Sequence, residues 1–220
     1  MTMPPFFRLD GVSFAYDHAH PVLAGACFRL APGEKVALTG PNGAGKTTLF
    51  HLMVGLLKPS SGTIEAFGAP RRTEREFKEV RARAGILFQD SDDQLFCPTV
   101  AEDVAFGPMN LGQSPADARI IVGQTLEMLG LNGFETRITH TLSGGQKRLV
   151  ALATVLAMRP DVLLLDEPTN ALDEATEARL TEILLGLPQA MVIISHDRAF
   201  LDRIATRRVR LDHGRLSEIG

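Results

Sequence analysis

The chain has few cysteines, no excess of positive charge and no long apolar run. Its two cysteines, Cys27 and Cys97, lie far apart and form no CxxC pair among the 220 residues. This usage favours a reducing compartment and argues against a thiolate metal site. The longest apolar run, from Leu149 to Met158, contains Thr154 and reaches about half of the roughly 18 residues that a membrane helix needs. We therefore expect no membrane span in this chain.

The charge balance excludes further classes of partner. The formal net charge is −3, so no global excess of positive charge draws the chain to nucleic acid or to anionic lipid. The N-terminus, residues 1–7, lacks the basic and apolar stretches of a targeting segment. With 45% hydrophobic residues the chain can close a core without disulfides, and its length predicts one core with a smaller lobe.

Short runs of Val, Ile and Leu recur along the chain and do not alternate with polar residues. Such runs are typical of strands buried on both faces of a parallel sheet. Helical stretches, for example 46–57 and 173–187, lie between them, so the pattern is βαβ and the predicted class is α/β. The predicted buried strands are Lys35–Thr39, Gly85–Phe88, Val162–Leu165 and Met191–Ser195.

Two regions depart from this βαβ pattern. Residues 8–16 and 26–30 are predicted to form short antiparallel strands at the edge of the sheet. Between residues 90 and 158 helical patterns dominate, with helices expected over 115–129 and 146–158. We expect one domain in which 1–89 and 159–220 form an α/β core with an N-terminal β subdomain, and 90–158 form an inserted helical subdomain. The charge runs at 71–83 and 206–210 are interpreted as solvated faces, with basic contact surfaces as the alternative.

A glycine-rich loop between a predicted strand and a predicted helix matches GxxxxGK[ST], the phosphate-binding P-loop pattern. Its glycines allow backbone N–H groups to turn towards an anion, and the helix N-terminus adds positive potential. Lys46 supplies a point charge and Thr47 offers a hydroxyl to Mg²⁺. The predicted ATP-binding residues are Gly40, Pro41, Asn42, Gly43, Ala44, Gly45, Lys46, Thr47 and Thr48.

An aliphatic strand then delivers two adjacent carboxylates. Asp166 follows Val162–Leu165 directly, at the strand end where open α/β sheets bind ligands, and is predicted to hold Mg²⁺. Glu167 is the candidate general base for a water, provided that its side chain points at the γ-phosphate. Taken alone, such a pair is also typical of a strand that ends in solvated acids.

Leu142 is followed by Ser143, Gly144, Gly145 and Gln146, and this segment resembles the signature of ATP-binding cassette (ABC) ATPases. Ser143 and Gln146 also form a capping-box pattern that opens a helix, which is the structural alternative. A cap does not need two glycines, and such a pair before a helix makes a second anion-binding concavity. The resemblance covers essentially the whole chain and implies a P-loop NTPase (RecA-like) cassette that binds ATP with Mg²⁺.

The resemblance assigns roles to further residues, in the order of the family's motifs. Tyr16 matches the aromatic that stacks on adenine, although an edge-strand aromatic packed on the core is the alternative. Gln89 matches the glutamine that contacts Mg²⁺ and the attacking water, and His196 matches the histidine that contacts the γ-phosphate. Asp173 matches the loop that crosses the dimer interface, although Asn170 stands where a serine is frequent.

In the family the signature caps the ATP that is held by a partner chain, so the resemblance implies a dimer with two composite sites. The expected catalytic residues are Lys46, Gln89, Glu167 and His196, and the expected Mg²⁺ ligands are Thr47, Gln89 and Asp166. The partner is a second copy or a related ATPase. Only 24 residues follow His196, so we expect the C-terminal extension of many relatives to be absent or minimal and the nucleotide-free dimer to be weak.

Residues 89–96 and 98–108 are similar to the ATPases of energy-coupling-factor (ECF) importers, notably the cobalt-transport group with its nickel and biotin relatives. This resemblance implies a membrane scaffold, a separate substrate-binding membrane subunit and a location at the cytoplasmic face of the membrane. Cobalt or another divalent metal is favoured over biotin as the substrate. His18 and His20 are interpreted as loop residues rather than metal ligands.

Two other functions remain as alternatives. A cassette that acts on nucleic acid or ribosomes normally brings a coiled-coil insertion, tandem cassettes or a basic surface, and none is visible in the sequence. A nucleotide-switched binding module without turnover is disfavoured by the presence of both Glu167 and His196.

Overall fold

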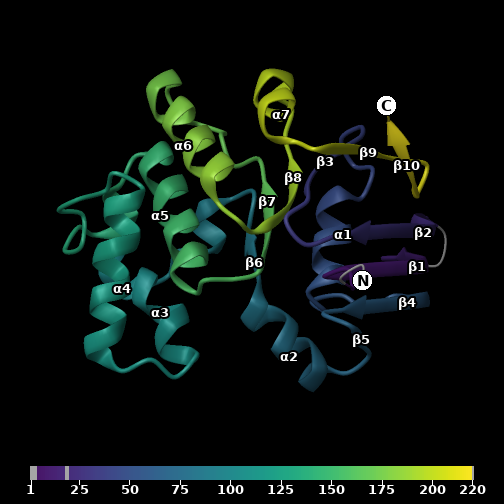
Figure 1. The fold of residues 1–220 in the computed structure, drawn as a ribbon, viewed down its shortest axis with the longest axis horizontal. Helices are drawn as coiled ribbons and strands as arrows, with labels where there is room; N and C mark the ends of the chain where they lie inside the picture. Colours follow the sequence, from purple (N-terminus) through teal and green to yellow (C-terminus); the bar gives the residue numbers. More distant parts are fainter. Residues whose placement is uncertain (1–3, 18–19, 220) are drawn as a thin grey trace. The chain divides into compact units, whose positions relative to one another are not determined.

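The computed structural model describes residues 4–17 and 20–219 (Figure 1). Contacts divide the chain into two units. The first comprises Met1–Ala84, Asp161–Leu164 and Pro188–Gly220, and the second comprises Gly85–Pro160 and Leu165–Leu187. The boundary runs through strands β6 (Ala84–Leu87) and β7 (Val162–Asp166), which contribute residues to both units. We expected the helical subdomain to comprise residues 90–158 alone. The second unit also contains residues 165–187, which we expected in the α/β core.

An antiparallel sheet in the order β2-β1-β4-β5 forms one part of the first unit (Figure 1). Its strands are β1 (Phe7–Ala15), β2 (Pro21–Leu30), β4 (Ser61–Ala66) and β5 (Ala69–Pro70). Strand β2 begins five residues before the predicted Ala26. Gly11 and Gly25 have φ angles of 61° and 70°, and the register of the β1–β2 pair shifts in this region. Such irregularities break the alternation from which the strand was predicted.

The second sheet carries the buried strands of the first unit. Its order there is β10-β9-β3-β8-β7, and β3 (Lys35–Thr39) pairs in parallel with both β8 (Ala190–Ile194) and β9 (Arg207–Asp212). Strands β7 and β8 are buried at every position, as the aliphatic runs predicted. Strand β10 (Arg215–Ile219) pairs antiparallel with β9.

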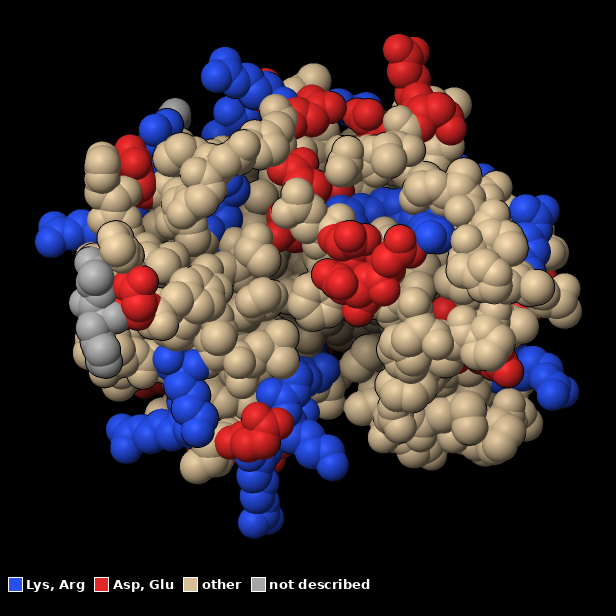
Figure 2. Space-filling model, turned by 180° about the vertical axis from the view of Figure 1, so that it is seen from behind, with Lys and Arg blue, Asp and Glu red and all other residues tan. Residues whose placement is uncertain are grey.

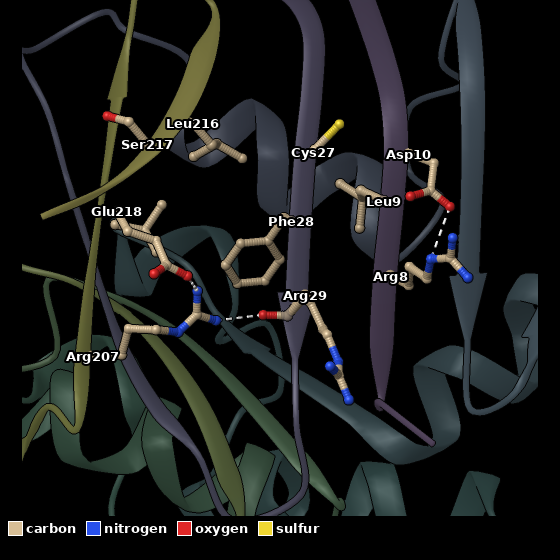
Figure 3. Close-up of a pocket in the computed structure, with 11 residues that line it drawn as sticks. Arg8, Leu9, Asp10, Cys27, Phe28, Arg29, Arg207, Leu216, Ser217 and Glu218 are labelled. Carbon is tan, nitrogen blue, oxygen red and sulfur yellow. Dashed lines mark hydrogen bonds and ion pairs between the residues drawn. The ribbon is translucent and has the colours of Figure 1, made fainter. Parts of the chain in front are cut away.

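Most of the predicted solvated charge run at 206–210 lies in β9, where Arg210 is exposed as expected but Arg207 is partly buried. Arg207 donates to Glu34 at 2.6 Å, to Glu218 at 2.8 Å and to the carbonyl oxygen of Arg29 at 2.5 Å. Figure 3 shows this guanidinium beside the ring of Phe28, in a pocket of about 270 Å³. Burial lowers the pKa of Arg207, but hydrogen bonds and charges from Glu34 and Glu218 raise it overall. The ion pair with Glu34 ties the C-terminal hairpin of β9 and β10 to the segment after β2, and the ion pair with Glu218 joins the two strands of the hairpin.

Helices α1 (Lys46–Met53), α2 (Glu74–Arg83) and α7 (Arg198–Ile204) complete the first unit. Helix α1 ends four residues before the predicted Leu57. Gly55 has a φ of 74°, and a Cβ at this position would lie 2.1 Å from the ring of Phe77. The left-handed turn at a glycine, packed closely on α2, therefore ends the helix.

The second unit is mainly helical. Its helices are α3 (Val100–Asn110), α4 (Pro115–Met128), α5 (Gly144–Ala157) and α6 (Glu174–Gly186), with short 3₁₀ helices at Ser91–Asp93 and Thr139–Thr141. Strand β6 lies beside β7. Helix α5 packs against α3 and α4, and most of its residues are buried. Among the described residues, no helix is both long enough and apolar enough to cross a bilayer.

Charged side chains of both signs are interspersed on the face shown in Figure 2, and wide uncharged areas separate them.

Candidate active site

The predicted site residues fall into two groups, one in each unit. In the first unit, residues 40–45 form a loop between β3 and α1. Gly43 and Gly45 have φ angles of 77° and 99°, and a Cβ at Gly40 would lie 2.2 Å from the carbonyl oxygen of Leu211. Glycine is therefore required at these positions by the backbone conformation or by the close approach of β9.

The Lys46 side chain folds back over this loop. Its Nζ donates to the carbonyl oxygens of Gly40 and Pro41, each at 3.0 Å. Helix α1 has Gly45 as its N-cap and no side-chain capping bond, so no capping side chain covers the N–H groups of its first turn. A glycine cradle, an ammonium group and a helix N-terminus are what a polyphosphate needs, and the loop therefore fits the phosphates of ATP.

A cavity of about 530 Å³ brings this cradle together with His196. His196 follows β8 and is exposed, and Ser195 beside it is buried. The cavity also contains Arg198, which sequence reasoning did not single out; its only signal was its place two residues after His196. The cavity is lined by Thr39, Gly40, Pro41, Asn42, Lys46, Ser195, His196, Arg198, Leu201, Arg208, Arg210 and Ile219.

Tyr16 is tied to the helix that follows the cradle. Its hydroxyl lies 3.2 Å from Oγ1 of Thr48, and its ring meets Phe14 edge-to-face at 4.9 Å between centroids. The residue is nevertheless 67% exposed. It therefore has both a packing contact and a large accessible surface. His18 lies outside the described residues, and Nδ1 of His20 lies 3.2 Å from a carboxylate oxygen of Asp17.

In the second unit the end of β7 carries the two predicted carboxylates. Asp166 is buried, and Glu167, directly after the strand, has a φ of 51°. A glutamate in the left-handed region is unfavourable by about 1 kcal/mol, so the surrounding contacts must hold this backbone in place. Gln89 follows β6 and is exposed.

Gln89, the signature and the loop before α6 meet in a second cavity, of about 230 Å³. It is lined by Gln89, Asp90, Ser91, Asp92, Leu142, Gly144, Lys147, Arg148, Asn170 and Ala171. Ser143 and Gly144 are exposed at the start of α5. Asp173 caps α6 by accepting from the N–H of Thr176 at 2.9 Å and from its hydroxyl at 2.8 Å, and these bonds lower the pKa of Asp173.

The predicted capping box at the signature is confirmed. The Gln146 N–H donates to Ser143 Oγ at 3.3 Å, and the Ser143 N–H donates to the Gln146 side chain at 3.1 Å. A capping role and an exposed glycine, Gly144, therefore occur in one segment.

The residues expected to hold Mg²⁺ supply oxygen donors only. Thr47 offers a hydroxyl in the first unit, and Gln89 and Asp166 offer an amide oxygen and a carboxylate in the second. This donor set fits Mg²⁺, which takes few carboxylates and retains phosphate and water ligands. Within residues 4–17 and 20–219, no three His, Cys, Asp or Glu side chains gather as a metal site of their own.

The comparisons with known proteins identify the family. Residues 23–170 match the family model described as ABC transporter, so the chain belongs to the ABC transporter family. It is 43% identical over 213 residues to the energy-coupling factor transporter ATP-binding protein EcfA of Methanothermobacter thermautotrophicus, across 95% of this chain and 68% of that protein.

Two solved structures share the fold. One is cbiO1 from Clostridium perfringens, described as part of the ABC transporter complex cbiONQ, with 33% identity, a TM-score of 0.86 and coverage of 98% of this chain and 88% of that chain. The other is a dimeric post-hydrolysis state of the ATP-binding cassette MJ0796 bound to ADP and Pi, with 26% identity, a TM-score of 0.89 and 97% coverage of both chains. The chain is therefore a P-loop ABC cassette and an ATPase, as the motifs predicted, and it resembles the ECF-type ATPases.

Proposed function

We propose that the chain is the ATP-hydrolysing subunit of an ECF-type importer. It works with a second copy or a related ATPase, at the cytoplasmic face of the membrane, beneath a membrane scaffold and a substrate-binding membrane subunit. One observation carries the proposal: a cassette with its cradle and signature in place is 43% identical to EcfA and superposes on cbiO1 with a TM-score of 0.86.

Each half of the site has its own chemical task. Lys46 and the N–H groups of the cradle bind and neutralise the phosphates, and Tyr16 offers its exposed ring to the adenine base. Glu167 accepts the proton of the attacking water, while Gln89 orients that water and His196 donates to the γ-phosphate. Thr47, Gln89 and Asp166 would hold Mg²⁺, which would supply positive charge to neutralise the phosphates. Electrostatic positioning of this kind provides most of the catalysis of phosphoryl transfer.

The exposed signature supports a dimer. Ser143 to Gln146 lie in the second unit and the cradle lies in the first, and Ser143 and Gly144 are open to solvent. In the proposed dimer the signature of one chain completes the ATP site of its partner, so ATP closes the dimer and hydrolysis reopens it. The dimeric state of MJ0796 supports this proposal.

The helical unit offers a place for the membrane scaffold. A groove of about 840 Å³ lies between α3 and α4, and Phe106 and Met109 on its wall are about half exposed. Glu102, Arg119 and Glu135 supply charge around this apolar surface. An apolar groove with a charged rim suits the apolar face of a helix from another protein.

For the transported substrate we propose a divalent metal ion, with cobalt first and biotin as the alternative. The similarity of the sequence to the cobalt-transport group supports this order. The substrate itself need not contact this chain.

Co-expression with candidate membrane subunits tests the proposal. We expect the chain to co-purify with a scaffold and a substrate-binding subunit, and the assembled complex to take up labelled cobalt, nickel or biotin. Glu167→Gln provides the matched control, because the complex should still assemble while uptake stops. A complex that forms only with nucleic acid or ribosomes would contradict the proposal.

A further inference from the structure

Arg148 is a buried cation that no motif assigns. It lies on α5, two residues after the signature glutamine Gln146, and is 3% exposed. Its guanidinium donates hydrogen bonds to four backbone carbonyl oxygens. Nη1 contacts the oxygens of Phe88 at 2.6 Å and Gln89 at 3.2 Å. Nε contacts the oxygen of Glu167 at 3.1 Å, and Nη2 contacts the oxygens of both Asp166 and Glu167.

These carbonyls mark the ends of two strands that carry the chemistry. Phe88 and Gln89 follow β6, Asp166 ends β7 and Glu167 comes directly after it. The backbone of Glu167 is in the left-handed region at a φ of 51°, and two of the bonds from Arg148 fall on its carbonyl oxygen. The guanidinium therefore fixes the backbone orientation of the residues proposed to position and deprotonate the water.

The backbone of Arg148 is part of α5, the helix that begins at the signature. Because α5 is a continuous helix from Gly144 to Ala157, a shift of the signature moves Arg148 with it. Gln94 makes a second bridge to the same strand end. It accepts from the N–H of Phe88 at 3.2 Å and donates to the carbonyl oxygen of Ala151 on α5 at 2.8 Å.

We propose that Arg148 is a positioning residue for hydrolysis, which makes the placement of Gln89 and Glu167 depend on the placement of the signature helix. The proposal rests on the roles proposed above for those two residues. Contact between the signature and a partner's nucleotide is then transmitted to the water-positioning residues of the signature's own chain. Only arginine has a planar fork with five N–H donors that can serve both strand ends at once.

Arg148→Lys tests this role, because it keeps the charge and removes the fork. The matched control is Arg159→Lys, two residues beyond the C-terminal end of α5, where Arg159 is exposed and its guanidinium lies 3.5 Å from Gln124. For each variant we would measure kcat and KM for ATP, the affinity for ATP, and hydrogen–deuterium exchange over residues 88–91 and 166–170 in the nucleotide-free protein.

For Arg148→Lys we expect kcat to fall by about tenfold to a hundredfold, because small misplacements of reacting groups have effects of that size. KM and the affinity for ATP should stay within about twofold, because the cradle lies in the other unit. Exchange should rise over both segments before nucleotide is added. Arg159→Lys should leave all four measurements unchanged.

Two results would overturn the inference: an unchanged kcat, or a fall in kcat that merely follows the loss of folded protein with no selective rise in exchange. Should Arg148→Lys not fold, Arg148→Gln is measured in the same way, and unfolding of both variants would assign Arg148 to stability alone. Glu167→Gln separates this inference from the proposed roles. If Glu167→Gln retains turnover, those roles are wrong, whereas a loss in Glu167→Gln with an unaffected Arg148→Lys contradicts only the role of Arg148.

Discussion

Gly145 of the signature packs directly against Ala171 of the loop that precedes α6. A Cβ at Gly145 would lie 2.9 Å from the carbonyl oxygen of Ala171, closer than a carbon and an oxygen ordinarily approach. Ala171 itself has a φ of 63°, so its carbonyl is fixed in a tight turn. The second signature glycine is therefore needed for packing within its own chain, in addition to any contact with nucleotide.

Gly145→Ala should consequently lower the stability of the protein. We expect a loss of about 1–3 kcal/mol from overpacking, and a fall in Tm of about 2–4 °C for each kcal/mol in a chain of this size. Gly144→Ala is the matched control, since its Cβ would lie 3.8 Å from the Cβ of Ala171, an ordinary contact. Equal Tm values for the two variants in a thermal melt would show that the close approach does not restrict residue 145.

Glu167→Gln should stop hydrolysis while nucleotide binding persists. The amide cannot take a proton from water, so we expect turnover to fall at least about a hundredfold, which corresponds to about 2.7 kcal/mol or more. ATP affinity, measured by equilibrium binding, should be unchanged because the cradle is untouched. Turnover near that of the wild type would remove Glu167 from the role of general base.

Tyr16→Ala should weaken ATP binding more than it lowers saturated turnover. Loss of a base stack costs about 1–3 kcal/mol, which corresponds to about fivefold to 150-fold in affinity. Tyr16→Phe keeps the ring and removes only the hydroxyl that contacts Thr48, so its affinity should stay near that of the wild type. An unchanged affinity in Tyr16→Ala would show that the ring serves packing on Phe14 rather than stacking on adenine.

Met109→Glu should disrupt assembly with the membrane scaffold and leave the ATPase of the isolated chain intact. Met109 is 49% exposed in the groove between α3 and α4, where a carboxylate would be costly to bury. Ile120→Glu is the matched control, because Ile120 is 59% exposed on α4 and does not line the groove. Equal co-purification of the two variants with the scaffold would show that the scaffold does not bind in this groove.

The elements that carry the motifs were predictable because their signals are local. The aliphatic runs of β3, β7 and β8 predicted buried strands, and the capping box at Ser143 predicted the start of α5. The candidate site residues were inferred from their places after these elements, and their roles stay predictions.

The features that escaped prediction depend on contacts between distant parts of the chain. The partial burial of Arg207 was not predicted, because Glu34, which pairs with it, lies 173 residues away in the sequence. The four carbonyls around Arg148 lie 18 to 60 residues away from it. Backbone acceptors leave no trace in residue type, so no pattern in the sequence indicates that this arginine is buried and bonded at two strand ends.

The central claim is that each active site is built from two chains. Sedimentation of Glu167→Gln with and without ATP and Mg²⁺ tests this claim most directly. We predict a species of about twice the mass of the chain with ATP and a single chain without it, because ATP holds the cradle of one copy to the signature of the other. An unchanged mass on addition of saturating ATP, or an equally stable dimer without nucleotide, would contradict this assembly.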